Sequence, residues 1–241
     1  MSGAPWPSEP GPGFERAPVP LQHAAWIAGP AGPLEALCDR PAVDCGTHAA
    51  LLCHPHPQYG GTMHSKVVYR AARAARDVGL PALRFNFRGA GRSAGAFDAG
   101  RGEADDVRAA LDRLATAYPG RRLVAGGFSF GAWMAVAAGA DDPRVAALVS
   151  IGTPIAIYGS AHLGRVTKPI LFVHGSEDPF GAAAEIEAIA AALPAARAVR
   201  VAGAGHLFAG QEGAVAVAVA GFLREIVGSV RIGPQGGSHE R

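Results

Sequence analysis

The sequence lacks several features that would place a protein in a class at once. It carries 22 Lys and Arg against 20 Asp and Glu, a formal net charge of +2, so neither sign of charge dominates. It has no run of basic residues with interleaved aromatics, which argues against a nucleic-acid or anionic-membrane surface. No apolar stretch approaches the roughly 20 residues that a membrane span needs. We therefore expect small-molecule partners rather than nucleic acid or membrane, and a monomer or a homodimer.

Targeting signals and cysteine pairs are also scarce. The N-terminal segment has no basic region followed by an apolar one, as a secretory signal peptide would have. The three cysteines are an odd number without metal-ligand spacing, and Cys53 ends an apolar run that predicts a core position. Cys38 and Cys45 could pair in an oxidising compartment, but free thiols are favoured inside a cell. We expect a cytoplasmic protein.

What the chain has instead is apolar content sufficient for a large core. Of its 241 residues 49% are hydrophobic and 17% are charged, which excludes global disorder and is typical of one buried domain. Residues 1–20 are rich in Pro and Gly and predict a flexible arm. A single domain is expected over 21–230, followed by a flexible tail over 231–241.

Short apolar runs alternate with segments of helical spacing along that domain. Extended runs at 24–28 and 34–38 enclose a Gly- and Pro-rich turn and predict an antiparallel hairpin. Strands are then expected at 49–53, 82–87, 123–125, 145–151, 170–173 and 198–201, and helices at 63–78, 103–118, 130–140, 182–193 and 212–227. This order predicts an α/β fold with a mostly parallel sheet and helices on both faces. The sixteen residues 152–167 leave room for a turn or a short helix but for no lid domain.

The strongest chemical signal is Gly-Phe-Ser-Phe-Gly at 127–131, between an expected strand and an expected helix. A serine on such a sharp turn is presented at the carboxyl end of the sheet, and the glycines let neighbouring backbone pass closely. The alternative is an ordinary glycine-rich loop with a helix-capping serine. Its placement favours Ser129 as a nucleophile.

A serine hydroxyl needs a base, and the base needs an orienting acid. Enzymes with this serine turn present the three in the chain order Ser, acid, His. Downstream, Asp178 and His206 each follow the end of an expected strand, on the same edge as Ser129. Glu177 competes for the acid role, but Pro179 ends the turn directly after Asp178, which favours Asp178. A loop carboxylate and a loop histidine without catalytic roles are the alternatives.

An oxyanion hole would need two backbone N–H groups near the nucleophile. Phe130, the residue after Ser129, is expected to supply the first. The second should come from the loop His-Pro-His-Pro-Gln-Tyr-Gly-Gly at 54–61, in which the prolines have no N–H. His56, Gln58, Tyr59 and the two glycines remain. His56 is the nearest candidate by position and Tyr59 the next.

Two further motifs resemble binding sites, but the sequence supports this interpretation only weakly. His54 and His56 could suggest a metal site, but no third ligand has suitable spacing, so we expect no metal. The segment Phe-Arg-Gly-Ala-Gly-Arg-Ser at 87–93 resembles a phosphate-binding loop yet lacks the required spacing and the Gly-Lys-[ST] of a P-loop. A tight turn is favoured there. Arg88 is then a structural partner of Asp105 or Asp106, or else an anion contact at the rim of the site.

Together these segments resemble a known family. The segments HPHPQYGGTMHSKVV, LRFNFRGAGRSAGAFDAGRGEADDV, AGGFSFGAWMA, VHGSEDP and GAGHLFAG are similar, in order, to the small lidless bacterial α/β-hydrolases. A more distant resemblance is to dienelactone hydrolases, which use a cysteine nucleophile. The resemblance implies an α/β-hydrolase fold, a Ser129–Asp178–His206 triad and an oxyanion hole that includes the HPHP loop. One departure is Pro-Phe-Gly-Ala at 179–182, where relatives tend to have branched apolar residues.

The expected activity is that of a serine hydrolase. The motifs and the resemblance predict cleavage of carboxylic esters through an acyl-enzyme, with short acyl chains preferred and no cofactor. A thioesterase, amidase or acyltransferase would use the same triad. A homologue that binds a ligand without catalysis is the alternative from another class.

Overall fold

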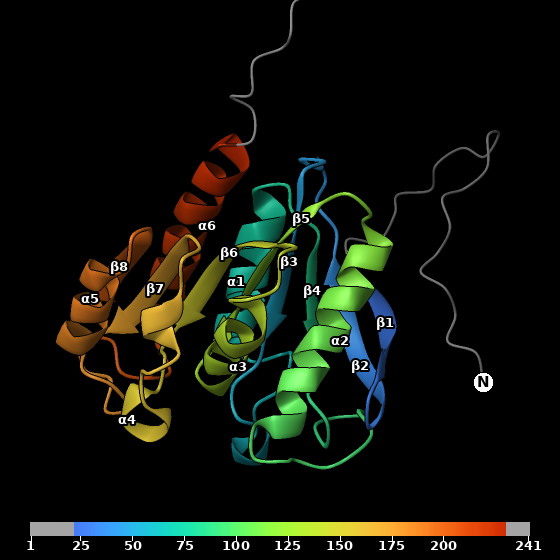
Figure 1. Cartoon of the computed structure of the whole chain (residues 1–241), viewed down its shortest axis with the longest axis horizontal. Helices are drawn as coiled ribbons and strands as arrows, with labels where there is room; N and C mark the ends of the chain where they lie inside the picture. Colours follow the sequence, from blue (N-terminus) through green and yellow to red (C-terminus); the bar gives the residue numbers. More distant parts are fainter. Residues whose placement is uncertain (1–21, 230–241) are drawn as a thin grey trace, which may run out of the picture.

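An eight-stranded sheet forms the centre of the computed structural model, which describes residues 22–229 (Figure 1). The strand order is β1-β2-β4-β3-β5-β6-β7-β8, with β1 and β2 antiparallel and β3 to β8 parallel to one another. The strands are β1 (Gln22–Gly29), β2 (Gly32–Asp39), β3 (His48–Cys53), β4 (Ala82–Phe85), β5 (Arg122–Phe128), β6 (Val145–Ile151), β7 (Ile170–Gly175) and β8 (Ala196–Val201). The predicted hairpin and mostly parallel sheet are confirmed. The predicted arm 1–20 and tail 231–241 lie outside the described residues.

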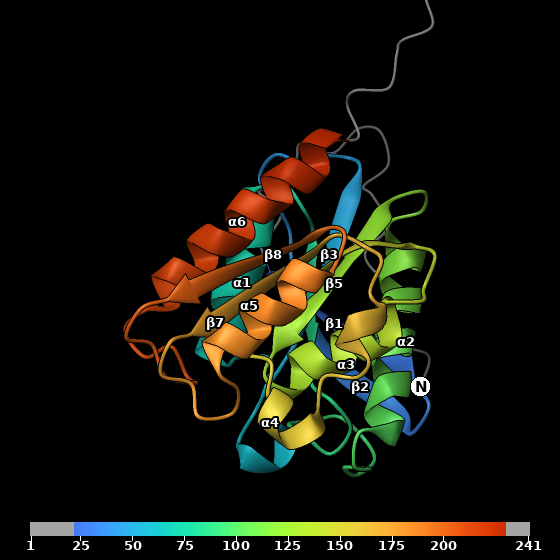
Figure 2. The ribbon, with the colours of Figure 1, turned by 60° about the vertical axis from the view of Figure 1, so that its left-hand side comes forward.

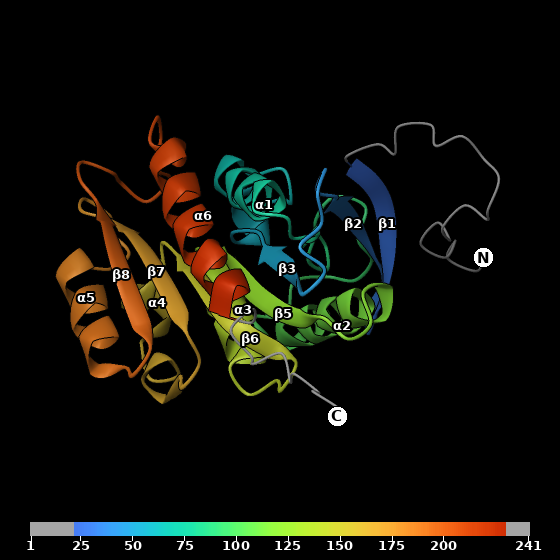
Figure 3. The same cartoon turned by 90° about the horizontal axis from the view of Figure 1, so that it is seen from above.

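Helices cover both faces of this sheet, as Figures 2 and 3 show. They are α1 (Lys66–Asp77), α2 (Arg101–Ala117), α3 (Phe130–Gly139), α4 (Ile155–Tyr158), α5 (Ala183–Ala192) and α6 (Glu212–Ser229), with 3-10 turns η1 (Pro57–Tyr59) and η2 (Leu163–Arg165). The buried side chains of α1 and α6 share one core with one face of the sheet. Those of α2, α3 and α5 form a second core on the other face. The sheet is therefore a middle layer between two helical layers.

The burial pattern of each strand follows from its place in the sheet. Every residue of β3 is buried because helices cover both of its faces, and its sequence His-Ala-Ala-Leu-Leu-Cys is correspondingly continuous in apolar character. The outer strand β1 alternates instead, with Ala25 and Ile27 buried and Trp26 exposed. The two cores thus lie on the two faces of the central strands, and the loops with the candidate site residues begin at the ends of these strands.

Several boundaries differ by a few residues from the sequence prediction, and two of these differences have identifiable reasons. Strand β5 continues to Phe128, past the apolar run, because Gly126 leaves room for Val149 of β6; a Cβ there would lie 2.8 Å from the Val149 side chain. Helix α1 begins at Lys66 rather than near Met63. The N–H of Met63 donates to Asn86 Oδ1 at 2.8 Å and its carbonyl accepts from Arg84 at 2.6 Å, so its backbone is held outside the helix.

The connection at 152–167 contains only the four-residue helix α4 and the turn η2. The prediction that this connection holds no lid domain is confirmed. Between residues 22 and 229 no helix is both long and apolar enough to cross a membrane.

The three cysteines are free thiols. Cys53 lies in the core, as its position in an apolar run predicts. Burial also raises the pKa of the Cys38 thiol to about 12, so that this cysteine stays protonated and unreactive.

Candidate active site

Ser129 occupies a strained turn between β5 and α3. Its φ of 56° and ψ of −124° lie in a region that residues with a side chain rarely adopt, at a cost on the order of 1–3 kcal/mol. The flanking glycines make the turn possible. A Cβ on Gly127 would lie 2.5 Å from the carbonyl of Gly131, and one on Gly131 would lie 2.5 Å from the carbonyl of Cys53. The turn therefore packs directly against the end of β3.

Three side chains form a continuous hydrogen-bond chain at this turn. His206 Nε2 lies 2.8 Å from Ser129 Oγ, and His206 Nδ1 lies 2.8 Å from Asp178 Oδ2. Because a carboxylate can only accept, Nδ1 carries the proton that faces Asp178, and Nε2 is left to accept the Ser129 hydroxyl proton. Ser129 is 8% exposed, and the carboxylate of Asp178 is fully buried. Both residues are therefore buried, and the Asp178 carboxylate reaches the surface of the site only through His206.

Parallel strands bring these residues together. Ser129 follows β5, Asp178 follows β7 and the loop of His206 follows β8, so all three lie at the carboxyl ends of the strands, an edge called here the carboxyl edge. Glu177 is exposed, whereas the carboxylate of its neighbour Asp178 meets the imidazole. The N–H of Phe180 donates to the other oxygen of Asp178 at 2.9 Å and orients the carboxylate.

The loop after β3 supplies few free N–H groups. Within it, Tyr59 and Gly61 both donate to the carbonyl of His56 at 3.1 Å, Gly60 donates to Pro57 at 3.3 Å, and Gln58 donates to the His56 imidazole at 3.2 Å. Tyr59, the second candidate from the sequence, therefore already uses its N–H to close a 3-10 turn. Across residues 22–229 no partner is found for the N–H of His56 or of Phe130.

His54 fixes the position of this loop. It is fully buried and its Nδ1 lies 2.5 Å from the carbonyl of Pro55, while its Nε2 accepts from the N–H of Phe87 at 2.9 Å. The proton consequently resides on Nδ1. Burial lowers the pKa of His54 to about 4, so the imidazole is neutral at physiological pH. Both ring nitrogens are occupied, and His54 holds the loop beside Ser129.

Comparison with known proteins places the chain in a family. Residues 48–214 match the model of the alpha/beta hydrolase domain. The chain belongs to the α/β-hydrolases. A solved alpha-beta serine hydrolase homologue from Coxiella burnetii is 33% identical with a TM-score of 0.78, covering 83% of this chain and 97% of its own. An α/β serine hydrolase without a lid from Xanthomonas campestris is also 33% identical, with a TM-score of 0.77 over 88% and 97% of the two chains.

An uncharacterized protein of Rickettsia prowazekii is 36% identical over 167 residues, which are 67% of this chain and 69% of that protein. The expected resemblance to small lidless α/β-hydrolases is thereby confirmed, and the chain is a hydrolase by family.

The segment 87–93 of this α/β-hydrolase is a structural turn. Arg88 donates through its guanidinium to Asp106 at 2.7 and 3.0 Å, and its own N–H also donates to Asp106 at 3.0 Å. Of the two sequence candidates, Asp106 is the partner, while Asp105 pairs with Arg108 at 2.5 Å on the surface. Arg88 is thus held in an ion pair, as the structural interpretation predicted.

Aromatic rings surround the serine on two sides. On the side of the HPHP loop, the His56 ring centroid lies 4.6 Å from Phe97 and 5.0 Å from Phe130. On the other side, the His206 ring lies 4.6 Å from Phe180 and 5.2 Å from Phe128. The rings around the candidate site are therefore mostly apolar, with the imidazoles of His56 and His206 as the polar ones.

Sequence reasoning assigned no role to His174, which also belongs to this site. It is buried at the end of β7, and its Nε2 lies 2.7 Å from the carbonyl of Gly181 and 3.5 Å from Asp178 Oδ2. Its spacing of four residues before Asp178 at a strand end is the signal that could have indicated it. No group of three or more metal-ligating side chains occurs in the part of the chain that the structure describes.

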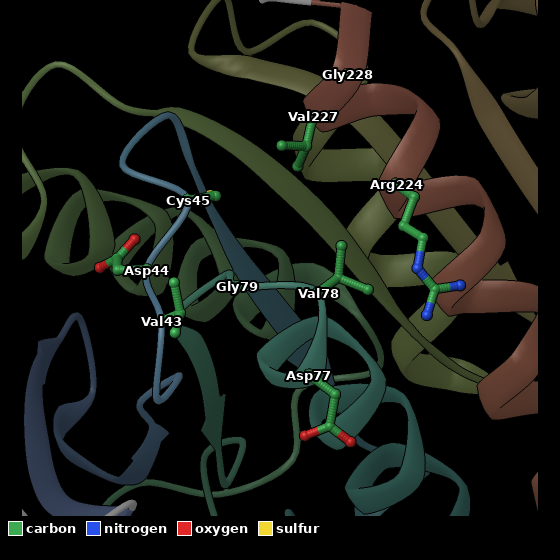
Figure 4. Close-up of a pocket in the computed structure, with 9 residues that line it drawn as sticks. All are labelled: Val43, Asp44, Cys45, Asp77, Val78, Gly79, Arg224, Val227 and Gly228. Carbon is green, nitrogen blue, oxygen red and sulfur yellow. The ribbon is translucent and has the colours of Figure 1, made fainter.

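A separate pocket opens at the opposite edge, where the parallel strands begin (Figure 4). Its volume is about 380 Å³, and it lies between the segment before β3, the end of α1 and the end of α6. The lining residues are Val43, Asp44, Cys45, Asp77, Val78, Gly79, Arg224, Val227 and Gly228. It contains none of the triad residues and is not the candidate active site.

Proposed function

We propose that this α/β-hydrolase cleaves carboxylic esters through an acyl-enzyme. Ser129 is the nucleophile, His206 the base and Asp178 the acid that orients the base. The observation that carries the proposal is the hydrogen-bond chain from Asp178 through His206 to Ser129, with 2.8 Å at both links. Its geometry matches the roles that serine hydrolysis requires.

In acylation the proton moves along this hydrogen-bond chain from Ser129 to His206. Ser129 Oγ attacks the carbonyl carbon while its proton passes to His206 Nε2, and the carbonyl electrons move onto the oxygen. The N–H groups of Phe130 and His56, which have no other partner in the described residues, are the proposed donors to that oxyanion. Asp178 stabilises the imidazolium. As the C–O bond to the alcohol breaks, the alcohol oxygen takes the proton from His206.

Deacylation repeats these steps with water in place of Ser129 as the attacking group. His206 accepts a proton from the water that attacks the acyl carbonyl, and returns it to Ser129 Oγ when the acid leaves. His206 carries the proton in both halves, from Ser129 Oγ to the leaving alcohol in acylation and from water to Ser129 Oγ in deacylation. A cytoplasmic location would suit such an enzyme and remains a prediction.

Short acyl chains are the proposed preference. Each buried methylene contributes roughly 0.8 kcal/mol to binding, but only where protein surface is available to cover it. The connection at 152–167 offers only the short helix α4 near the site. Selectivity for chain length should therefore level off after a few carbons.

Thioesters, amides and acyl transfer to another alcohol would follow the same chemistry, since the triad does not distinguish leaving groups or acceptors. A ligand-binding protein without catalysis is the competing hypothesis from another class. The intact hydrogen-bond chain and the unpartnered donors favour catalysis over binding alone.

Covalent labelling and turnover test the proposal together. A fluorophosphonate should modify the wild-type chain once, and peptide mass spectrometry should place the adduct on Ser129. p-Nitrophenyl acetate should give a burst of one nitrophenolate per chain followed by steady turnover. The variant Ser129→Ala is the control and should show neither. Labelling elsewhere, or esterase activity that survives in Ser129→Ala, would contradict the assignment.

A further inference from the structure

Exposed large apolar side chains gather around the candidate active site. Seven are found among the described residues, and four of them lie in segments that border the triad: Tyr59, Ile157, Phe180 and Leu207. Single exposed apolar residues are common on any surface, but a group at a catalytic edge indicates contact with a ligand. Two of the four, Phe180 and Leu207, lie beside His206.

Phe180 is exposed and yet held in place. The residue is 39% exposed, and its ring meets the His206 ring edge to face, with 4.6 Å between the centroids and an interplanar angle of 78°. Its N–H donates to Asp178 at 2.9 Å, and its carbonyl accepts from Ala156 at 2.9 Å. An aromatic ring fixed in this way loses little conformational entropy when a ligand packs on it.

The following residue immobilises the turn further. Gly181 accepts a hydrogen bond from the buried His174 at 2.7 Å. A Cβ on Gly181 would lie 2.8 Å from the Ile155 side chain and 3.2 Å from the carbonyl of Thr153, so the chain packs there without a gap. The position of the Phe180 ring is therefore set by the core beneath it.

The direction of proton transfer identifies which part of a substrate meets Phe180. In the acylation step proposed above, the alcohol oxygen must come within hydrogen-bonding distance of His206 Nε2 to take its proton. The substituent on that oxygen then lies against the exposed groups beside the imidazole. Of the two rings against His206, Phe180 is exposed and Phe128 is buried, and Leu207 is the exposed residue that follows His206 in the chain.

We infer that Phe180, supported by Leu207, is the binding surface for the alcohol portion of the ester, and that the preferred esters carry an aryl group in that portion. The inference rests on the proposed function. Aromatic pairs in edge-to-face or offset contact gain about 0.5–1.5 kcal/mol beyond area burial, which corresponds to a factor of about 2 to 13 in a rate constant. The acyl portion lies away from His206 and is not selected by this surface.

Three acetates that differ only in the alcohol test the inference: benzyl, cyclohexylmethyl and ethyl acetate. All of them form the same acetyl-enzyme, so the alcohol affects kcat/KM and not deacylation. The benzyl and cyclohexylmethyl alcohols are similar in size and basicity and differ in aromaticity. In the wild-type enzyme, kcat/KM for benzyl acetate should exceed that for cyclohexylmethyl acetate by about three- to tenfold.

Variants at position 180 distinguish two roles of Phe180, which are contact with the alcohol portion of the ester and orientation of the Asp178 carboxylate. Phe180→Ala should lower kcat/KM for benzyl acetate about tenfold while changing that for ethyl acetate less than twofold. Phe180→Leu should keep activity on cyclohexylmethyl acetate and lose the preference for benzyl acetate. Hydrolysis of the acetyl-enzyme, measured after a p-nitrophenyl acetate burst, should be unchanged in both variants. Ile157→Ala removes a matched exposed apolar residue and should leave the alcohol preference intact.

An equal loss on all three acetates, or slower deacylation, would mean that Phe180 acts only through Asp178 and would overturn the inference while the proposed function stands. Turnover of p-nitrophenyl acetate without detectable turnover of benzyl acetate would overturn it as well. If no acetate is hydrolysed and no fluorophosphonate adduct forms, the proposed function itself fails and the inference fails with it.

Discussion

The loops at the carboxyl ends of the strands differ in backbone conformation from the loops at the amino ends. Among the described residues, the three non-glycine residues with positive φ are Ala99, Ser129 and Phe208, and all three lie in segments that follow carboxyl ends of strands. At the opposite edge, where the strands begin, positive φ occurs at Gly46, Gly79 and Gly120 in turns that lead into β3, β4 and β5. Backbone strain is thus concentrated where the triad lies.

The edges also differ in what their polar groups do. At the carboxyl edge, Asp178, His206 and Ser129 form one hydrogen-bond chain that ends at the Ser129 hydroxyl. The pocket at the other edge is lined by the acidic Asp44 and Asp77 and by Arg224, but it holds no comparable chain in the described residues. A concave surface alone therefore does not mark the chemistry. In the function proposed here, the strained turn of Ser129 and the side chains hydrogen-bonded to it mark the chemistry.

Removal of the serine hydroxyl is the largest expected effect. Ser129→Ala should lower kcat on the order of a millionfold, because the nucleophile and its proton are lost. Ser129→Gly should be equally inactive, yet its free energy of unfolding should exceed that of Ser129→Ala by about 1 kcal/mol, since glycine relieves the strain at φ 56°. Ester kinetics and urea unfolding measure the two effects. Equal stability of the two variants would show that the turn is not strained.

The acid gives the next largest effect. Asp178→Asn should lower kcat about ten-thousandfold, because an amide favours the wrong imidazole tautomer and does not offset the imidazolium charge. Glu177→Gln changes an exposed neighbour and should stay within about twofold of wild type. Steady-state kinetics on the same ester compares them. A larger loss in Glu177→Gln would reverse the assignment of the acid.

Acidification should weaken the loop that carries the proposed oxyanion donor. Burial lowers the folded-state pKa of His54 to about 4, below the 6.5 of an unfolded histidine, so the stability it contributes is full above pH 6.5 and is lost as pH falls toward 4. Between pH 7.5 and 4.5 this histidine should account for about 2 to 3 kcal/mol of lost unfolding free energy.

Urea unfolding of wild type and His54→Asn at the two pH values measures this contribution. The slope of stability with pH should be shallower in His54→Asn and unchanged in His64→Asn, which removes an exposed histidine. The same slope in all three proteins would contradict the prediction.

A substitution at the amino ends of the strands should change stability and leave activity unchanged. A Cβ at Gly79 would lie 3.0 Å from the carbonyl of Val43 and would require a side chain at φ 94°. Gly79→Ala should therefore lower the unfolding free energy by about 1–2 kcal/mol with kcat/KM unchanged. Gly164→Ala, where a Cβ meets open space, is the matched control and should change stability by less than about 0.5 kcal/mol. A loss of activity in Gly79→Ala would contradict this and show that the amino ends of the strands influence the candidate active site.

Acyl-chain length should give the smallest effect. From acetyl to butyryl p-nitrophenyl esters, kcat/KM should rise by at most about fourfold per methylene and then level off, because the connection at 152–167 forms no lid over longer chains. Octanoyl esters should be no better substrates than butyryl esters. A kcat/KM that keeps rising into long chains would show that another element forms an apolar wall over the site.

Local signals in the sequence were enough for the elements and for the candidate nucleophile. The apolar run at 145–151 corresponds to β6 residue for residue, because a buried parallel strand must be apolar on both faces. The strand–serine–helix order placed Ser129 at the turn after β5. Glycine-rich strand ends were underestimated, as in β5, since the lack of a side chain there reflects a neighbour that only the folded sheet provides.

The sequence by itself determined the α/β order, the hairpin, the missing lid and the edge at which Ser129, Asp178 and His206 meet, because strand direction follows from chain connectivity. Only the tertiary structure decided between neighbours with the same chemistry. Asp178 rather than Glu177 meets the imidazole, because the N–H of Phe180 binds one oxygen of the Asp178 carboxylate and leaves the other to face His206. Within the described part of the chain, the N–H of His56 has no partner, whereas that of Tyr59 is used in the 3-10 turn. Which donor remains free depends on the hydrogen bonds of the folded loop, which the buried His54 holds in place through the N–H of Phe87.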